Sequence, residues 1–135
     1  DTWPDWIHVE THTLLSPLML TALERLPATI ATASSRGSDM AHLIAPHLTT
    51  PPTIGCPDGY KLDELDTFIA AHRPARVVWI DDDLAWQPNR QRIVQHRPGF
   101  LLRPDPLVGI TPDDIILIRA WLTDTAPGDV QIDRR

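Results

Sequence analysis

Arg76-Val77-Val78-Trp79-Ile80-Asp81-Asp82-Asp83-Leu84 is the stretch that decides the fold. Its apolar run ends abruptly at three adjacent carboxylates. A continuous apolar run with such a boundary predicts a buried strand of a parallel sheet over residues 77–81. Open α/β sheets bind ligands at the carboxyl ends of such strands. The three acids suit a hard cation such as Mg²⁺, or they are solvated residues that cap the next helix. This stretch alone favours neither interpretation.

Segments of helical and extended character alternate around this strand. Ser16-Pro17 and Thr111-Pro112 each place a capping hydroxyl before a proline, which is typical of a helix start. Two further helices are predicted from Ser38, with an apolar face that reaches Leu48, and from Lys61. The remaining predictions are strands over 7–12, 28–33 and 100–103, an irregular loop over 49–59, a short helix over 88–96 and a loose tail over 123–135. The alternation predicts an α/β fold, with a mainly parallel sheet flanked by helices, in one domain over residues 1–122.

The composition is that of an ordinary globular protein. The chain has 135 residues, of which 42% are hydrophobic and 22% are charged. Its net charge of -6 argues against non-specific binding to nucleic acids or membrane surfaces. No apolar stretch approaches the length of a membrane span, and the single cysteine, Cys56, fits a reducing compartment. These features predict a cytoplasmic location.

Hydroxyl, amine and carboxylate side chains follow one another at strand ends and helix starts. The strand over 28–33 ends near Thr32, with Ser34 just beyond it, and Lys61 opens a helix. Hydroxyls and an ammonium group hold phosphate, while Asp81 and Asp82 would hold Mg²⁺ against the phosphate oxygens. Thr32 taken alone is an ordinary strand threonine, and Lys61 taken alone is a solvated lysine. The order of the three groups is more specific than any one of them, and it predicts a phosphorylated substrate.

With these residues in place, the chain resembles the haloacid dehalogenase superfamily of phosphohydrolases, in particular its small actinobacterial and phage-type members. The matching stretches cover most of the chain up to Leu122 and are residues 1–6, Ser16-Pro17 with its helix, Ile30-Ala31-Thr32, Met40 to Leu48, Lys61-Leu62, Trp79-Ile80-Asp81-Asp82, Asp105-Pro106 and Gly109-Ile110-Thr111. The resemblance implies that Thr32 contacts phosphate, that Lys61 stabilises a phosphorylated intermediate and that Asp81 and Asp82 help to bind Mg²⁺. Trp3 and Trp6 then either cover the site or pack on the rim of the domain.

The chain departs from this family in one large respect. The family's first motif is a strand that ends in Asp-x-Asp, and nothing in the sequence matches it. The resemblance places that strand in the middle of the sheet, between the strand that ends at Thr32 and the strand that ends at Asp81. Without it, two strand edges would carry unpaired backbone groups. We therefore expect the nucleophile strand to lie upstream of Asp1. The alternative is an inactive scaffold of this fold that binds a partner.

Overall fold

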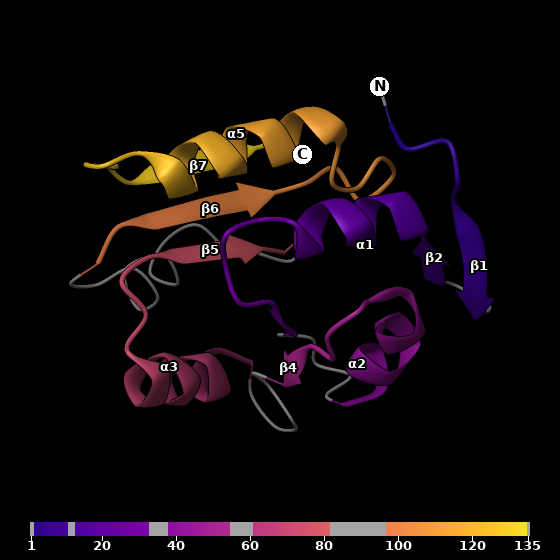
Figure 1. The fold of residues 1–135 in the computed structure, drawn as a ribbon, viewed down its shortest axis with the longest axis horizontal. Coiled ribbons are helices and arrows are strands. Elements are labelled where there is room, and N and C mark those ends of the chain that lie inside the picture. The colour runs from indigo at the N-terminus through magenta and orange to yellow at the C-terminus, as the bar shows by residue number, and fades with distance from the viewer. Residues whose placement is uncertain (1, 11–12, 33–37, 55–60, 82–96, 135) are drawn as a thin grey trace.

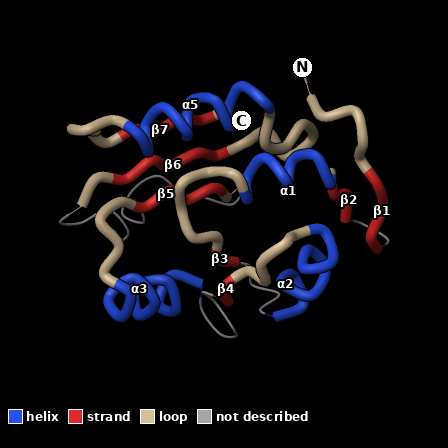
Figure 2. Tube along the Cα trace, in the orientation of Figure 1, coloured by secondary structure: helices blue, strands red, loops and turns tan. Residues whose placement is uncertain are grey.

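The computed structural model describes residues 2–10, 13–32, 38–54, 61–81 and 97–134, which form a mixed α/β fold (Figure 1). The strands are β1 (Ile7–Glu10), β2 (Thr13–Leu15), β3 (Ala31–Thr32), β4 (Thr53–Ile54), β5 (Val77–Ile80), β6 (Gly99–Arg103) and β7 (Val130–Asp133). The described helices are α1 (Pro17–Glu24), α2 (Ser38–Ile44), α3 (Lys61–His72) and α5 (Pro112–Thr123), with a 3₁₀ turn η1 (Ala45–His47) after α2. Figure 2 shows how these helices and strands alternate along the chain. None of the described helices has the length and apolar character needed to cross a bilayer.

The strands form three separate sheets within the described residues. β5, β6 and β7 make a parallel sheet with β6 in the middle, β3 and β4 make a short parallel pair, and β1 and β2 make an antiparallel hairpin. In the three-stranded sheet Val78 lies beside Phe100, and Phe100 lies beside Val130. The predicted parallel α/β architecture is confirmed at this level.

Helices cover both faces of the three-stranded sheet, as a buried parallel sheet requires. Phe100 and Leu102 of β6 pack on one face against Ile115, Ile118 and Trp121 of α5, and Leu26 after α1 joins them. On the other face, Trp79 and Leu101 pack against two residues of α3. Those two residues are Leu65 and Ile69. The sheet is therefore the middle layer of three, with α1 and α5 on one side and α3 on the other (Figure 1).

The helix starts predicted from Ser16-Pro17 and Thr111-Pro112 are confirmed. The hydroxyl of Ser16 accepts a hydrogen bond from the Met19 N–H at 3.0 Å. Thr111 and Asp114 form a reciprocal capping box, because the Thr111 hydroxyl accepts from the Asp114 N–H while the Asp114 carboxylate accepts from the Thr111 N–H. Such caps satisfy N–H groups that a helix end leaves unpaired. Local sequence thus fixes where α1 and α5 begin.

The prediction of a loose tail over 123–135 is wrong for its last part. Val130–Asp133 is β7, which pairs in parallel with β6 and turns Val130 and Ile132 toward the core. Arg103 and Asp133 lie side by side across the two strands and form an ion pair of 2.6 Å. Arg134 reaches the buried Asp114 at 3.1 Å. Pairing with β6 gives this segment its structure, since its own apolar pattern spans only four residues.

Other elements also differ from the predictions: β5 ends at Ile80 and β6 begins at Gly99, each one residue from the predicted bound, and β2 was not predicted. The strand predicted over 28–33 is only Ala31–Thr32, because β4 offers it just two partner residues. β4 itself lies inside the predicted irregular loop over 49–59. The helix that was expected to reach Leu48 ends at Ile44 and continues as a 3₁₀ turn, where Pro46 cannot donate a helical hydrogen bond. The helix predicted over 88–96 lies outside the described residues.

Arg76 fixes the end of α5 opposite its capping box. Its guanidinium donates to the Trp121 carbonyl at 3.0 Å and to the Leu122 carbonyl at 2.7 Å. We expect Arg76→Met to lower the free energy of unfolding by about 1–3 kcal/mol, since two helix-end carbonyls lose a charged donor. Urea denaturation measures the change. Arg119→Met, at an exposed position of the same helix, is the matched control, and an equal loss in both variants would contradict the cap.

Candidate functional site

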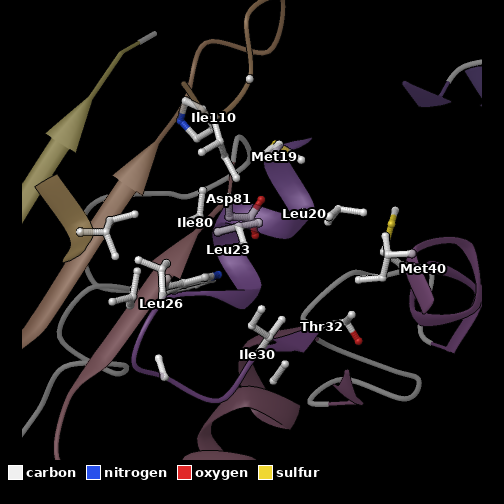
Figure 3. Close-up of a pocket in the computed structure, with 18 of the residues that line it drawn as sticks. Met19, Leu20, Leu23, Leu26, Ile30, Thr32, Met40, Ile80, Asp81 and Ile110 are labelled. Carbon is white, nitrogen blue, oxygen red and sulfur yellow. The ribbon is translucent and has the colours of Figure 1, made fainter. Parts of the chain in front are cut away.

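A cavity of about 1070 Å³ lies between the two parallel sheets and is lined by residues of both β3 and β5. In Figure 3, Ile30 and Thr32 reach it from the β3 side, and Ile80 and Asp81 reach it from the end of β5. Its volume is slightly above the range of roughly 300–1,000 Å³ that is usual for small-molecule sites. The cavity is therefore the candidate functional site.

Most of the cavity wall is apolar. Leu20 and Leu23 of α1 line it together with Leu65 and Phe68 of α3, and Met40 of α2 lies at one end (Figure 3). These helices cover opposite faces of the sheet, so the cavity is walled by hydrocarbon both above and below the level of the strands. A ligand that is charged along its whole length would lose its hydration here without compensation.

Among the predicted site residues whose side chains the structure describes, Thr32 has a buried polar atom without a hydrogen-bond partner. Its side chain is buried, with 6% exposed, and its hydroxyl has no hydrogen-bond partner in the part of the chain that the structure describes. A buried hydroxyl without a partner costs about 1–3 kcal/mol. The arrangement fits a ligand or segment that would supply the partner.

Asp81 follows β5 directly and lines the same cavity, half-buried. Its N–H donates to the Leu102 carbonyl at 3.1 Å, so the backbone of β5 fixes the position from which its carboxylate extends. Thr32 and Asp81 thus stand at the ends of two strands that border one cavity (Figure 3). No three acidic, histidine or cysteine side chains converge on a metal position within the described residues.

The other predicted site residues are placed only in part. Lys61 is the first residue of α3, as predicted. Its side chain, Ser34, Asp82 and Asp83 lie outside the described part of the chain. The structure therefore brings Thr32 and Asp81 to one cavity and leaves the remaining proposed ligands as predictions.

Within the described residues, the backbone of β5 has an unpaired edge, which the sequence analysis did not predict as part of the site. Val77 donates its N–H to the carbonyl of Pro98, just before β6, at 3.2 Å, and Asp81 donates its N–H to the Leu102 carbonyl of β6 at 3.1 Å. Because backbone groups alternate along a strand, Val78 and Ile80 direct theirs to the opposite edge. No described strand pairs with that edge. The signal in the sequence was the unbroken apolar run, which is typical of a strand with neighbours on both sides.

The segment before β1 forms the rim of the cavity. Trp6 and Thr2 line it, and the Trp6 ring lies 3.3 Å from where a Cβ on Gly109 would be, so a larger residue at 109 would press on the ring. Trp3 packs on the core and donates to the Ile110 carbonyl at 2.7 Å. Trp3 therefore packs on the body of the domain, whereas Trp6 borders the cavity.

Asp5 holds this rim segment against the start of α1. Its carboxylate accepts from the Ser16 hydroxyl and from the Leu18 N–H, the latter at 2.8 Å. Partial desolvation raises the pKa of Asp5, but the hydrogen bonds from Ser16 and Leu18 outweigh it, so the pKa lies below its usual value of 3.8. The charged form of Asp5 is thus the one that the fold favours.

Comparisons of the chain with protein-family models, with curated proteins and with solved structures found no match. Any function must therefore be argued from this cavity and its residues.

The lowered pKa of Asp5 predicts an acid-sensitive contribution to stability. A depressed folded-state pKa means that the contribution is present above pH 3.8 and is lost as the pH falls through the folded-state value. Asp5→Asn should therefore destabilise the protein near neutral pH, and the difference from the wild type should shrink below pH 3.8. Urea denaturation across this range measures it. Asp113→Asn, at an exposed acid in the first turn of α5, controls for loss of charge, and a pH-independent difference for Asp5→Asn would refute the prediction.

Proposed function

We propose that this chain is a haloacid dehalogenase-like domain that binds a phosphoryl group and Mg²⁺ where β3 and β5 end, and that it serves as a Mg²⁺-dependent phosphohydrolase. The observation that carries the proposal is the placement of Thr32 and Asp81. The two residues stand at the ends of strands from different sheets, yet both line one cavity. Ligands of α/β proteins bind at such strand ends.

Each residue then has a defined role. The unpartnered hydroxyl of Thr32 would donate to a phosphate oxygen, and Lys61 would neutralise its charge from the start of α3. Asp81, with Asp82, would bind Mg²⁺, which withdraws charge from the phosphate. An aspartate on a further strand would attack phosphorus and form an aspartyl-phosphate that water then hydrolyses. No described residue occupies that nucleophile position, so the proposal requires the additional strand.

The apolar wall of the cavity favours a second candidate, a scaffold that binds a partner and carries out no chemistry. Leucine, isoleucine and valine side chains dominate the wall, and polar residues such as Thr32 and Asp81 are a minority of its lining. In this case Thr32 would hydrogen-bond to the partner and Asp81 would serve the fold. Hydrolysis of a phosphate ester would support the phosphohydrolase, and its absence would support the binding scaffold.

The first test of the phosphohydrolase concerns metal binding. Millimolar Mg²⁺ should raise the melting temperature of the native protein by several degrees, because a cation at a hundredfold excess over its dissociation constant stabilises the folded state by about 2.7 kcal/mol. Asp81→Asn should remove this shift, and Asp113→Asn should keep it. A shift that survives Asp81→Asn, or no shift in the wild type, would leave Asp81 without a metal role.

The second test concerns turnover. The protein, expressed with everything its gene encodes, should hydrolyse para-nitrophenyl phosphate only when Mg²⁺ is present. Thr32→Val, which removes the hydroxyl and keeps the shape, and Asp81→Asn should each lower kcat/KM by about a hundredfold or more. Steady-state kinetics measures the loss, with Asp113→Asn as the control. Absence of turnover in protein that still melts cooperatively would support the binding scaffold instead.

A further inference from the structure

We propose that the cavity between β3 and β5 is a receptor for one extended apolar strand of a partner polypeptide, which enters parallel to β5 and joins β3 and β5 into a single sheet. The proposal rests on the second candidate function, the binding scaffold, because the phosphohydrolase would fill the same space with its own nucleophile strand. It rests on the backbone of β5, on the cavity wall and on two unsatisfied polar side chains.

The first argument is the composition of the open edge. Edge strands are normally protected by charges, prolines or bulges. β7, at the other edge of the described sheet, follows this rule: Gln131 and Asp133 alternate with apolar residues, and Asp133 pairs with Arg103. β5 reads Val-Val-Trp-Ile and has none of these features, although its Val78 and Ile80 amides face the cavity. β5 is thus built as an interior strand, and the cavity lies where its second neighbour would pair.

The second argument is that apolar side chains line the cavity on both sides of the plane in which the strands lie. Leu20 and Leu23 of α1 lie above it, and Leu65 and Phe68 of α3 lie below it. A strand between these helices would bury both of its faces. The partner strand should therefore have the composition of an interior parallel strand, which is a run of about five β-branched or aliphatic residues without polar alternation.

The third argument favours a peptide strand over a small apolar ligand. The Thr32 hydroxyl and the Trp79 indole N–H are buried without a hydrogen-bond partner within the described residues, and both residues line the cavity. A hydrocarbon ligand would leave these groups, and the backbone groups of Val78 and Ile80, unpaired. A peptide strand offers donors and acceptors along its whole length, together with apolar side chains for the helices.

The experiment uses a fluorescein-labelled peptide, Lys-Lys-Val-Ile-Val-Ile-Val-Lys-Lys, titrated with the 135-residue protein. Fluorescence anisotropy should show saturable one-to-one binding. The same peptide with a central proline should bind at least about tenfold more weakly, because proline removes a ladder donor and distorts the strand. A third peptide, with serine and threonine in place of the apolar residues, keeps the four lysines. It controls for attraction to the acidic protein and should not bind.

A matched pair of protein variants tests the edge itself. Ile80→Pro removes an amide that faces the cavity but keeps the amides of Val77 and Asp81, which bond to Pro98 and to Leu102 of β6. Ile80→Ala shortens the same side chain and keeps the amide. The proline variant should lose at least about tenfold in affinity relative to the alanine variant. Should the proline variant fail to fold, the proline peptide tests the same hydrogen bonds from the other side.

Orientation is tested by a nitroxide attached to the carboxyl end of the peptide. In a parallel arrangement it should broaden the amide signals of Thr32 and Asp81 more than that of Val77. The proposal is overturned by equal binding of the apolar and proline peptides, by broadening strongest at Val77, or by no binding. Peptide binding that merely dissociates a dimer of this chain, seen by analytical ultracentrifugation, would also overturn it, because the cavity would then belong to a second copy. Loss of peptide binding in the protein expressed with everything its gene encodes would overturn it as well, because the cavity would then belong to a strand of the same chain.

Discussion

The structure depends on the burial of β6 from both sides. Leu101 and Leu102 are adjacent, so their side chains point to opposite faces of the sheet, and only 1% and 0% of them are exposed. Leu101 belongs to the cluster under α3, and Leu102 belongs to the cluster under α1 and α5. A shift of β6 by one residue would exchange these faces. Its register therefore ties the two helical layers together, and that register in turn places β5 and the cavity beside it.

Much of the fold could be predicted because its signals are local. The caps at Ser16 and Thr111 satisfy helix N–H groups within three residues, so no distant partner is needed to define where α1 and α5 start. The apolar runs of β5 and β6 also stand out, since a strand buried on both faces has no polar residue to interrupt it. Prediction succeeded where one short segment contained the whole physical cause.

Prediction failed where the cause lay elsewhere in the chain. β7 looks irregular alone because Val130 and Ile132 are only two apolar positions after Pro127 and Gly128, and β6 supplies the pairing that makes them a strand. β4 has only two residues, directly after a proline pair, and its partner β3 is equally short. For the site, the sequence placed Thr32 and Asp81 at strand ends. It could not show that two sheets would remain separate, with a cavity between them, because sheet pairing is a long-range property.

The cavity combines demands that are hard to satisfy with any single simple ligand. Its leucine and phenylalanine wall favours apolar contents, whereas the Thr32 hydroxyl and the amides of Val78 and Ile80 need hydrogen bonds. Phosphate would meet the need at Thr32 but would not fill the apolar length of the cavity. An inserted strand would meet the apolar and backbone needs, and its peptide groups would also offer a hydrogen-bond partner to the Thr32 hydroxyl. The two proposals therefore compete for the same space: the phosphohydrolase would fill the gap between β3 and β5 with its own nucleophile strand, whereas the binding scaffold would fill it with a strand of a partner.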